Sequence, residues 1–485
     1  MKVLLVSMPM RHGGATAIFP LGLSYISAAV RKAGHEVELL DLNRNYDWDR
    51  KRIERYLSEA NFDVAGISAM ITDFVNVQTI AKIIRICHPK PKVILGGGLG
   101  TTVPELMLRE TEVDIVVAGE GDVTIVELLD ALESDGEWRN VPGLCYLSGD
   151  ETTKSPPRTL IPSLDSLPHP DRELFDLDFY LRTPDWWFNV PKADIITSRG
   201  CPYQCIFCDQ AIFTRKFRPR SAESLVREIQ YLKSEHGVKA LEFRDDSFNI
   251  NRKRVMAFCR EMERTKTHIW FTCNCRINHV DDEMLAAMRR VGCVGITYGI
   301  ETGDENVLKQ IKKGHTLEQV RYAVRATRAQ GMIVGGYMML GFPGETRESM
   351  ERSVALCAEL GLSAIFSIVT PIPGTELFDQ AFAAGKVKSV EEVCRNWSNT
   401  FAGIACNLTD IPDDELWEFK RKAEDGLRLR VLFANPRSLL QLWHNYARAN
   451  GWGGLLARIL RSIKTTFRRL HAPVPRTEAV LGWPK

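Results

Sequence analysis

The sequence predicts an α/β protein in which two sheet-containing domains are followed by a mostly helical C-terminal region. Two series of short apolar runs alternate with segments of helical periodicity, and a proline-rich stretch separates the series. The runs are almost entirely apolar, as strands are when helices cover both faces of a parallel sheet. With 485 residues, 45% of them apolar and 26% charged, the chain can form several folded domains.

We expect four segments. Residues 1–148 predict a Rossmann-like (flavodoxin-like) domain, 149–191 a proline-rich linker, 192–395 a partial β/α barrel and 396–485 a helical, basic region. In both kinds of sheet, ligands bind at the carboxyl ends of the strands. The expected strands of the first domain are 3–6, 37–40, 64–68, 93–95 and 115–118, and its helices include 21–33, 48–60, 75–87 and 124–132. Those of the barrel are strands 195–198, 241–244, 270–275, 295–300, 334–340 and 364–368, with helices such as 221–236 and 252–266.

Glycines gather where strands of the first domain end. They fill the run 96–100 apart from Leu99, flank Glu120, and precede Ser68 by two residues. Glycine lets the backbone approach a bulky ligand, although tight turns between strand and helix use it in the same way.

Three cysteines, Cys201, Cys205 and Cys208, follow the first expected strand of the barrel at spacing C-x3-C-x2-C. Thiolates are the usual ligands of a [4Fe–4S] cluster, and three of them leave one iron open for a substrate or cofactor. A structural zinc site would need a fourth ligand, and no fourth Cys or His lies near Cys208 in the sequence. A disulfide knot is not favoured either, because nothing marks the chain for secretion.

This cysteine motif, with an aromatic residue directly before Cys208, resembles that of the radical S-adenosylmethionine superfamily. The resemblance implies that the three cysteines hold a [4Fe–4S] cluster whose open iron chelates S-adenosylmethionine, with Phe207 near the adenine. Reductive cleavage of the cofactor would give a 5'-deoxyadenosyl radical.

Further segments carry the resemblance through most of the barrel, so that it covers about residues 1–380 with the first domain included. Asp246, in an Asp-Asp-Ser-Phe segment, matches a residue near the amino group of the cofactor. Arg276 matches an arginine aimed at its carboxylate, and Glu301 a glutamate that binds the ribose. The alternative for Arg276 is an internal ion pair with Glu301. Cys273 and Cys275 lie on one face of a strand, and we expect them to be buried core residues rather than hydrogen donors.

The first domain resembles the cobalamin-binding domain of cobalamin-dependent radical enzymes. The resemblance rests on the segments that begin at Pro20, Arg31, Val64 and Gly119, and it implies that Ser68, Gly97, Gly98 and Glu120 bind cobalamin. The chain departs from the family in two ways. It has no Asp-x-His-x-x-Gly motif, so no histidine ligand to cobalt is expected, and Leu99 stands where relatives often have histidine.

The resemblance implies an enzyme that methylates an unactivated carbon of a small biosynthetic intermediate, with cobalamin as methyl carrier. The alternative is a cobalamin-independent radical dehydration, cyclisation or epimerisation of a natural-product intermediate such as a sugar, with the first domain empty or structural. A cobalamin- or redox-sensing binding protein is a third reading, for which a complete barrel would be superfluous. The expected partners are a small-molecule substrate and a one-electron reductant such as flavodoxin or ferredoxin. No motif for reading nucleic acid is present.

The C-terminal region is strongly basic. Residues 426–477 contain ten Lys or Arg and no Asp or Glu, whereas the rest of the chain has 53 basic and 61 acidic residues. Apolar residues at helical spacing alternate with basic ones over 456–468, which predicts a basic amphipathic helix. Such a helix can lie on an anionic membrane surface, or its apolar stripe can dock on the barrel. A third alternative is that the basic patch attracts an anionic substrate or a partner protein. No leader or membrane-spanning segment is evident, so we expect a cytoplasmic protein, with peripheral membrane contact as an option.

Replacing any one of the three cysteines with alanine (Cys201→Ala, Cys205→Ala or Cys208→Ala) should abolish the charge-transfer absorbance of the cluster. The formation of 5'-deoxyadenosine should be lost with it, because the cluster supplies the electron that cleaves S-adenosylmethionine. Full turnover in such a variant would contradict the cluster assignment.

Overall fold

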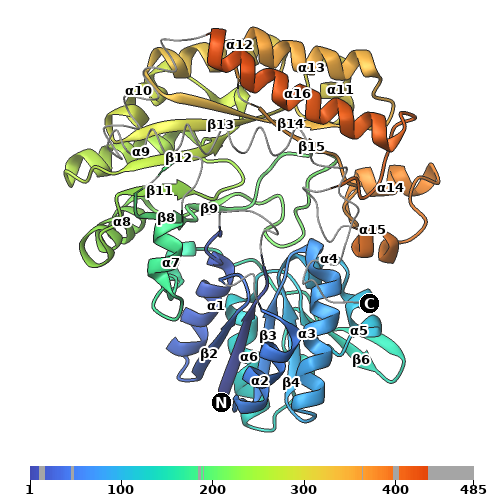
Figure 1. Ribbon diagram of the computed structural model, residues 1–485. Coiled ribbons are helices and arrows are strands. Elements are labelled where there is room, and N and C mark those ends of the chain that lie inside the picture. The colour runs from blue at the N-terminus through green and yellow to red at the C-terminus, as the bar shows by residue number, and fades with distance from the viewer. Residues whose placement is uncertain are drawn as a thin grey trace.

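The computed structural model describes residues 1–9, 17–44, 48–183, 187–188, 190–362, 364–396 and 403–434. Figure 1 shows two α/β domains stacked on each other, the N-terminal domain below and the barrel above it. The predicted basic helix at 456–468 lies outside the described residues.

The N-terminal domain has a seven-stranded sheet in the order β2-β1-β3-β4-β5-β6-β7. Strands β1 to β5 are parallel and have the flavodoxin-like order, whose switch point lies between β1 and β3. The strands are β1 (Lys2–Ser7), β2 (Glu36–Asp41), β3 (Val64–Ser68), β4 (Lys92–Gly96), β5 (Ile115–Val117), β6 (Leu144–Ser148) and β7 (Glu151–Lys154). The helices are α1 (Leu21–Lys32), α2 (Arg50–Glu59), α3 (Phe74–Cys87), α4 (Gly97–Thr102), α5 (Pro104–Glu110) and α6 (Gly121–Glu133).

The prediction of this domain needs two corrections. The sheet does not end at residue 148, because β6 and β7 form an antiparallel hairpin that extends it to Lys154. β7 is an exposed edge strand with a polar sequence, so it lacks the apolar pattern from which strands were predicted. The glycine run is not a loop either, since α4 begins at Gly97 directly after β4. Gly97 has φ +86°, and a Cβ there would lie 2.6 Å from the carbonyl oxygen of Ala69, so the turn into α4 requires glycine.

The barrel is a six-stranded, fully parallel sheet in the order β15-β14-β13-β12-β11-β8. Its strands are β8 (Lys192–Ile195), β11 (Ala240–Phe243), β12 (Trp270–Cys275), β13 (Cys293–Glu301), β14 (Ile333–Leu340) and β15 (Ala364–Ile368). Its helices are α8 (Ala222–His236), α9 (Arg252–Arg264), α10 (Asp282–Arg290), α11 (Glu305–Gln310), α12 (Leu317–Ala329) and α13 (Arg347–Glu359).

The first barrel strand begins three residues earlier than predicted. Lys192 and Asp194 made this segment look too polar for a strand, but both are buried. Lys192 pairs with Glu242 at 2.9 Å, and Asp194 accepts a hydrogen bond from Arg244 at 3.1 Å. The end of the predicted strand instead forms β9 (Ser198–Arg199), which pairs antiparallel with β10 (Arg218–Pro219).

The segment between the domains is held to the barrel by a buried arginine. It contains α7 (Leu177–Arg182), and its buried Arg172 donates to the carbonyl of Asp194 at 2.7 Å and pairs with Glu228 at 3.1 Å. Trp187 lies against Gly295 in β13, where a Cβ would meet its ring at 2.4 Å. Phe188 is buried, while Trp186 lies outside the described residues.

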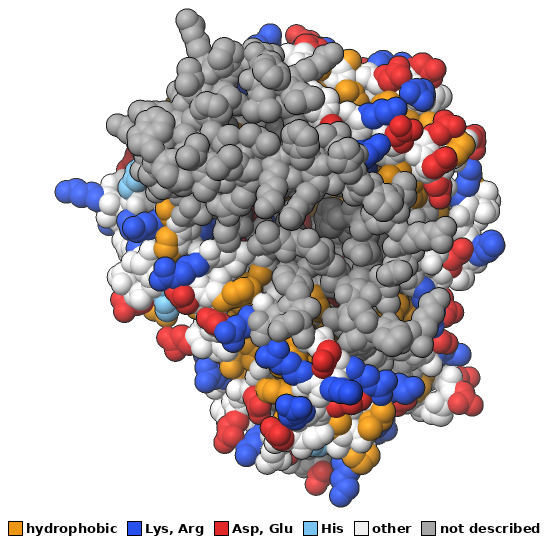
Figure 2. All heavy atoms as spheres, viewed as in Figure 1, with side chains coloured by type: hydrophobic (Ala, Val, Ile, Leu, Met, Phe, Trp, Pro, Cys, Tyr) orange, Lys and Arg blue, Asp and Glu red, His pale blue; other side chains and the backbone are white. Residues whose placement is uncertain are grey.

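The two domains share apolar packing. Ile206, Phe342 and Val369 from the barrel belong to the same buried cluster as Leu99 and Met107 of the N-terminal domain. The chain continues through α14 (Glu376–Ala383), α15 (Val390–Asn396) and α16 (Asp413–Ala434), of which α15 contacts α3, and α16 contacts α13 and β15. The described residues include no helix that is long and apolar enough to cross a membrane. On the face in Figure 2, basic and acidic side chains of the N-terminal domain are interspersed.

Leu99 is fully buried in the shared apolar cluster, so Leu99→His should not restore a cofactor contact. Burying an imidazole without a partner should lower the free energy of unfolding by about 2 kcal/mol. Denaturant unfolding followed by circular dichroism would measure the loss, and Leu99→Met, which keeps the volume, should lose less than about 1.5 kcal/mol. A histidine-ligated cobalamin spectrum in Leu99→His would contradict this prediction.

Candidate cofactor site and the boundary between the domains

The three cysteines lie on the loop 200–217, which β9 and β10 close at its two ends and which we call the cluster loop. Cys201 and Cys205 are buried, and Cys208 is half-buried. Burial raises the pKa of Cys201, and it raises the pKa of Cys208 to about 11. These thiols would therefore bind metal with release of protons. Gln210 Nε2 donates to Cys208 Sγ at 3.1 Å, and Arg276 Nη1 lies 3.6 Å from Cys205 Sγ, so both sulfurs already face hydrogen-bond donors.

The spacing of the cysteines fits a cluster better than a single ion. Among the described residues, no group of three or more His, Cys, Asp or Glu side chains could hold one metal ion. In a cubane cluster each protein ligand binds a different iron, so the ligands lie farther apart than those of one zinc ion.

Asp245 fixes the chain just before the cluster loop. Its carboxylate accepts hydrogen bonds from the backbone of Thr197 and Ser198, each at 2.7 Å, and from the Thr197 hydroxyl. One of the two adjacent carboxylates predicted to bind a ligand therefore binds the backbone. Asp246 makes no hydrogen bond or ion pair with any described residue, and the residue keeps exposed surface although protein surrounds much of its carboxyl group. Nearby protein and the charge of Asp245 raise its pKa to about 6. Asp246 stays the candidate for the amino group of the cofactor.

Two arginines close the cluster loop, and carboxylates of the N-terminal domain hold them. Arg199 in β9 and Arg218 in β10 are paired directly across the two strands, and both are buried. Arg199 donates to Asp122 at 2.8 and 3.0 Å and to Glu120 at 3.0 Å, while Arg218 donates to Glu120 at 2.7 Å. Two like charges facing each other across a ribbon repel, so the carboxylates are what permit the pairing. We call these four residues the interdomain clamp.

The clamp changes the interpretation of Glu120. Both of its oxygens bind protein, because Oε2 also accepts from the backbone N–H of Ile161 at 3.0 Å. The expected contact between this side chain and cobalamin is therefore replaced by a structural contact with the barrel. Arg199, Arg218 and Asp122 were not predicted as site residues, although Arg199 lies only two residues before the first cysteine.

Arg276 lies over the cluster loop and does not pair with Glu301. Its guanidinium lies 3.5 Å from the centre of the Tyr203 ring and donates to the carbonyl of Lys313 as well as facing Cys205. The alternative of an Arg276–Glu301 ion pair is therefore wrong. Glu301 pairs instead with Lys313, a buried residue that the sequence analysis did not identify.

Glu301 has an unusual backbone conformation. It ends β13 with φ +69°, and the register against β14 shifts beside it. A non-glycine residue at positive φ is strained, and such strain gathers at functional sites. Phe207, the candidate for the adenine contact, lies on the same side, because Lys313 Nζ is 5.8 Å from the centre of its ring. The predicted residues Phe207, Arg276 and Glu301 thus surround one lysine.

A cavity of about 410 Å³ joins the cluster loop to the N-terminal domain. Its lining includes Thr101 and Thr102 of α4, Cys205 and Cys208 of the cluster loop, and Gly374. Ser68 and Gly96 are register partners at the ends of β3 and β4, on the edge of the sheet that carries α4. A Cβ at Gly98 would have its nearest neighbour at 3.9 Å, and one at Gly119 would have none within 4 Å, so a ligand can approach the backbone there. The backbone at this edge of the sheet is therefore open to a ligand at Gly98 and Gly119.

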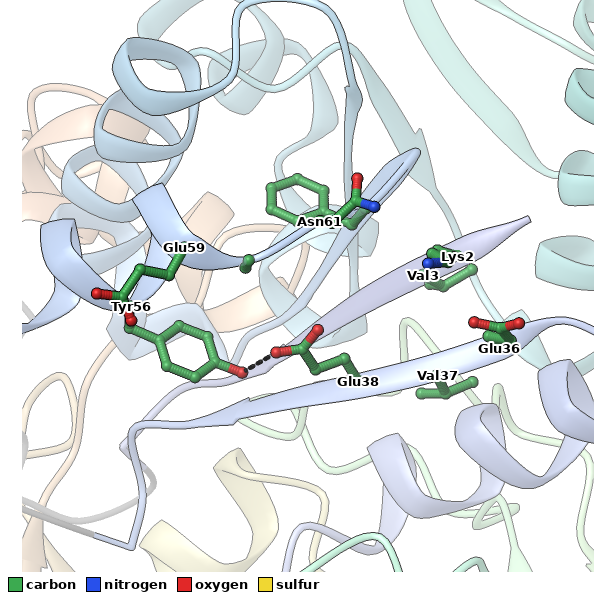
Figure 3. A pocket seen from close by; sticks show the side chains of 10 residues that line it. Lys2, Val3, Glu36, Val37, Glu38, Tyr56, Glu59 and Asn61 are labelled. Carbon is green, nitrogen blue, oxygen red and sulfur yellow. Dashed lines mark hydrogen bonds between the residues drawn. The ribbon is translucent and has the colours of Figure 1, made fainter.

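A second cavity, of about 570 Å³, lies at the opposite edge of the sheet, where β1 and β2 begin (Figure 3). Its lining includes Lys2, Glu36, Glu38 and Tyr56, and the Tyr56 hydroxyl donates to Glu38 at 2.7 Å. None of the predicted site residues lines it, and parallel sheets bind ligands at the other edge.

Comparison with known proteins agrees with this arrangement. A model of the radical SAM superfamily matches residues 195–357, and a model of the B12 binding domain matches residues 15–129. An uncharacterized methyltransferase of Pyrococcus horikoshii, PH0819, is 32% identical over 438 residues, which cover 89% of this chain and 93% of that protein. The chain belongs to the radical S-adenosylmethionine enzymes that carry a B12-binding domain. The cofactors of this enzyme are thus a [4Fe–4S] cluster, S-adenosylmethionine and cobalamin, as predicted.

Other relatives differ in reaction. The cytidylyl-2-hydroxyethylphosphonate methyltransferase of Streptomyces wedmorensis is 29% identical and covers 79% of the enzyme and 82% of its own length. The anaerobic magnesium-protoporphyrin IX monomethyl ester cyclase of Cereibacter sphaeroides is also 29% identical, covering 77% and 62%. Among solved structures, TsrM of Kitasatospora setae with cobalamin and a [4Fe–4S] cluster bound has a TM-score of 0.69 at 21% identity, covering 81% and 79%. This likeness confirms the predicted fold.

Removing one charge of the interdomain clamp should destabilise the enzyme and its cluster loop together. Asp122→Asn leaves a net positive charge buried, which should cost about 3–5 kcal/mol of unfolding free energy. Denaturant unfolding would measure the loss, and iron content after anaerobic reconstitution should fall with it. The control is Asp130→Asn on the same helix, where the side chain is 60% exposed. Unchanged stability and iron content in Asp122→Asn would contradict the role of the clamp.

Proposed function

We propose that the enzyme transfers a methyl group to an unactivated carbon of a small biosynthetic intermediate. When bound, the cluster and S-adenosylmethionine would supply a hydrogen-abstracting radical in the barrel, and cobalamin would supply the methyl group from the N-terminal domain. The chain itself must hold these groups in register and exclude water.

The observation that carries this proposal is the cavity between the domains. The cluster cysteines and the threonines of α4 line the same cavity. The expected cluster site of the barrel therefore faces the expected cobalamin site of the N-terminal domain. Methyl transfer to a carbon radical needs this proximity, whereas radical chemistry in the barrel alone does not. The interdomain clamp keeps the facing edges in a fixed geometry.

The side chains around Lys313 suit the recognition of S-adenosylmethionine. The guanidinium of Arg276 would bind the cofactor carboxylate, and the carboxylate of Asp246 would bind the amino group. Glu301 would accept hydrogen bonds from the ribose, and Phe207 would pack beside the adenine. Ser68, Gly97 and Gly98 would meet cobalamin through backbone at the edge of the sheet.

The names of two relatives, both methyltransferases, support the reaction class. The similarity to a magnesium-protoporphyrin ester cyclase favours a second candidate, a radical cyclisation or other rearrangement without methyl transfer. For the substrate we propose a lipid or tetrapyrrole intermediate, because the basic C-terminal sequence would bring the enzyme to a membrane surface. A flavodoxin or ferredoxin would supply the electron.

Isotope transfer tests the reaction. Enzyme purified without oxygen, after expression with cobalamin supplied, should contain nearly stoichiometric cobalamin. With a reductant and S-adenosylmethionine labelled in its methyl group, it should move label into the small-molecule fraction of a cell extract. S-adenosylhomocysteine and 5'-deoxyadenosine should form together, as measured by mass spectrometry.

The control is Cys208→Ala, which should form neither product. Cluster-loaded enzyme without cobalamin that forms 5'-deoxyadenosine but no S-adenosylhomocysteine would overturn methyl transfer and favour the cyclisation candidate.

A further inference from the structure

His315 is a buried side chain without a partner next to the cofactor residues. It lies between α11 and α12 with 6% of its surface exposed, and neither ring nitrogen forms a hydrogen bond. Other histidines of the chain do have partners: His88 Nε2 lies 2.6 Å from the carbonyl of Leu57, and His279 bonds the Tyr203 hydroxyl. Native proteins rarely bury a polar group without a partner, so this imidazole points to a ligand.

The segment that carries His315 runs along the cluster loop. The backbone N–H of Ile206 donates to the carbonyl of Ile311 at 3.2 Å, and the Cys205 thiol lies 3.8 Å from the carbonyl of Lys312. Arg276 binds the carbonyl of Lys313, and Asn278 Nδ2 donates to the carbonyl of Gly314 at 3.4 Å. One short stretch of backbone thus touches the residues expected to bind the cluster and the carboxylate of S-adenosylmethionine.

The charges around His315 decide which hydrogen bonds it offers. Burial, and then the charges of Lys313 and Arg276, lower its pKa to about 3, so the imidazole is neutral. A neutral imidazole has one N–H donor and one acceptor nitrogen. This pair suits a group that both donates and accepts, such as a ribose hydroxyl or the edge of adenine. A carboxylate, which only accepts, would use one nitrogen and leave the other orphaned.

The position of His315 favours the adenosine half of the cofactor. Arg276 is held at the cluster side by Tyr203 and Cys205, where the amino-acid half would lie. Glu301, the candidate for the ribose, pairs with Lys313, two residues before His315. The backbone carbonyl of Ile300, the neighbour of Glu301, lies beside the His315 ring and opposes the lowering of its pKa, but it does not meet the geometry of a hydrogen bond.

We propose that His315 hydrogen-bonds the adenosine part of S-adenosylmethionine, through a ribose hydroxyl or the adenine edge. The inference depends on the binding of S-adenosylmethionine in this barrel and not on methyl transfer, so its failure and that of the proposed function are distinguishable.

Equilibrium binding to the cluster-loaded protein tests the proposal. His315→Phe fills the space without hydrogen bonds and should weaken the binding of S-adenosylhomocysteine about tenfold. Free methionine lacks the adenosine part, so it should perturb the electron paramagnetic resonance spectrum of the reduced cluster at the same concentration in wild type and variant. His315→Gln keeps one donor and one acceptor and should bind S-adenosylhomocysteine within about threefold of wild type.

The control is His88→Phe, which removes a histidine of the N-terminal domain and should leave both ligands unaffected. Iron content and melting temperature establish that each variant is folded and loaded. Unchanged affinity of His315→Phe for S-adenosylhomocysteine would overturn the proposal. Equal weakening in the Phe and Gln variants, or equal weakening of both ligands, would overturn it as well, because packing would then explain the effect.

Discussion

The interdomain clamp is the constraint on which the rest of the site depends. Arg199 and Arg218 bracket the cluster loop from opposite strands of a two-residue ribbon, too short to be stable alone. Glu120 and Asp122 make this pairing possible by neutralising both cations where water is excluded. The N-terminal domain therefore contributes contacts that hold both ends of the loop that carries the cysteines. The turn that carries Glu120 also begins α6, so the same few residues set the geometry of both domains.

Around the cluster loop, some charged side chains are paired with protein groups, and their neighbours remain available to bind ligands. Asp245 accepts hydrogen bonds from the backbone of Thr197 and Ser198, whereas Asp246 remains free to bind a ligand. Lys313 neutralises Glu301, while Arg276 is steered toward Cys205 by the Tyr203 ring. Lys313 and Arg276 thus bring two cations to this region, against the one buried carboxylate of Glu301, and His315 is neutral. The resulting positive excess suits a cofactor that carries a carboxylate, and the orphaned imidazole adds hydrogen-bonding capacity without a third charge.

The sequence analysis succeeded where chemistry is local and failed where partners are distant. The metal-binding motif lies within the short segment from Cys201 to Cys208. The apolar runs predicted the parallel strands, because burial on both faces of a sheet leaves a continuous apolar pattern. The strand at Lys192 was placed too late, and the edge strand at Glu151 was missed. The first contains buried charges and the second is exposed, so neither has the pattern on which the prediction relied. Leu99 looked like a lost ligand, but it is a core residue of α4.

The sequence by itself determined the two α/β domains, the three cysteines and the cofactors that they imply. Periodicity and ligand spacing are properties of neighbouring residues, so these features could be read without coordinates. Only the tertiary structure decided which charged side chains are free to bind ligands. Glu120, Asp245 and Arg199 are committed to protein partners 41 to 98 residues away, whereas Asp246 and His315 have none among the described residues. Such long-range pairing depends on how the domains pack, because the strength of an ion pair is set by burial and by distances that local sequence does not encode.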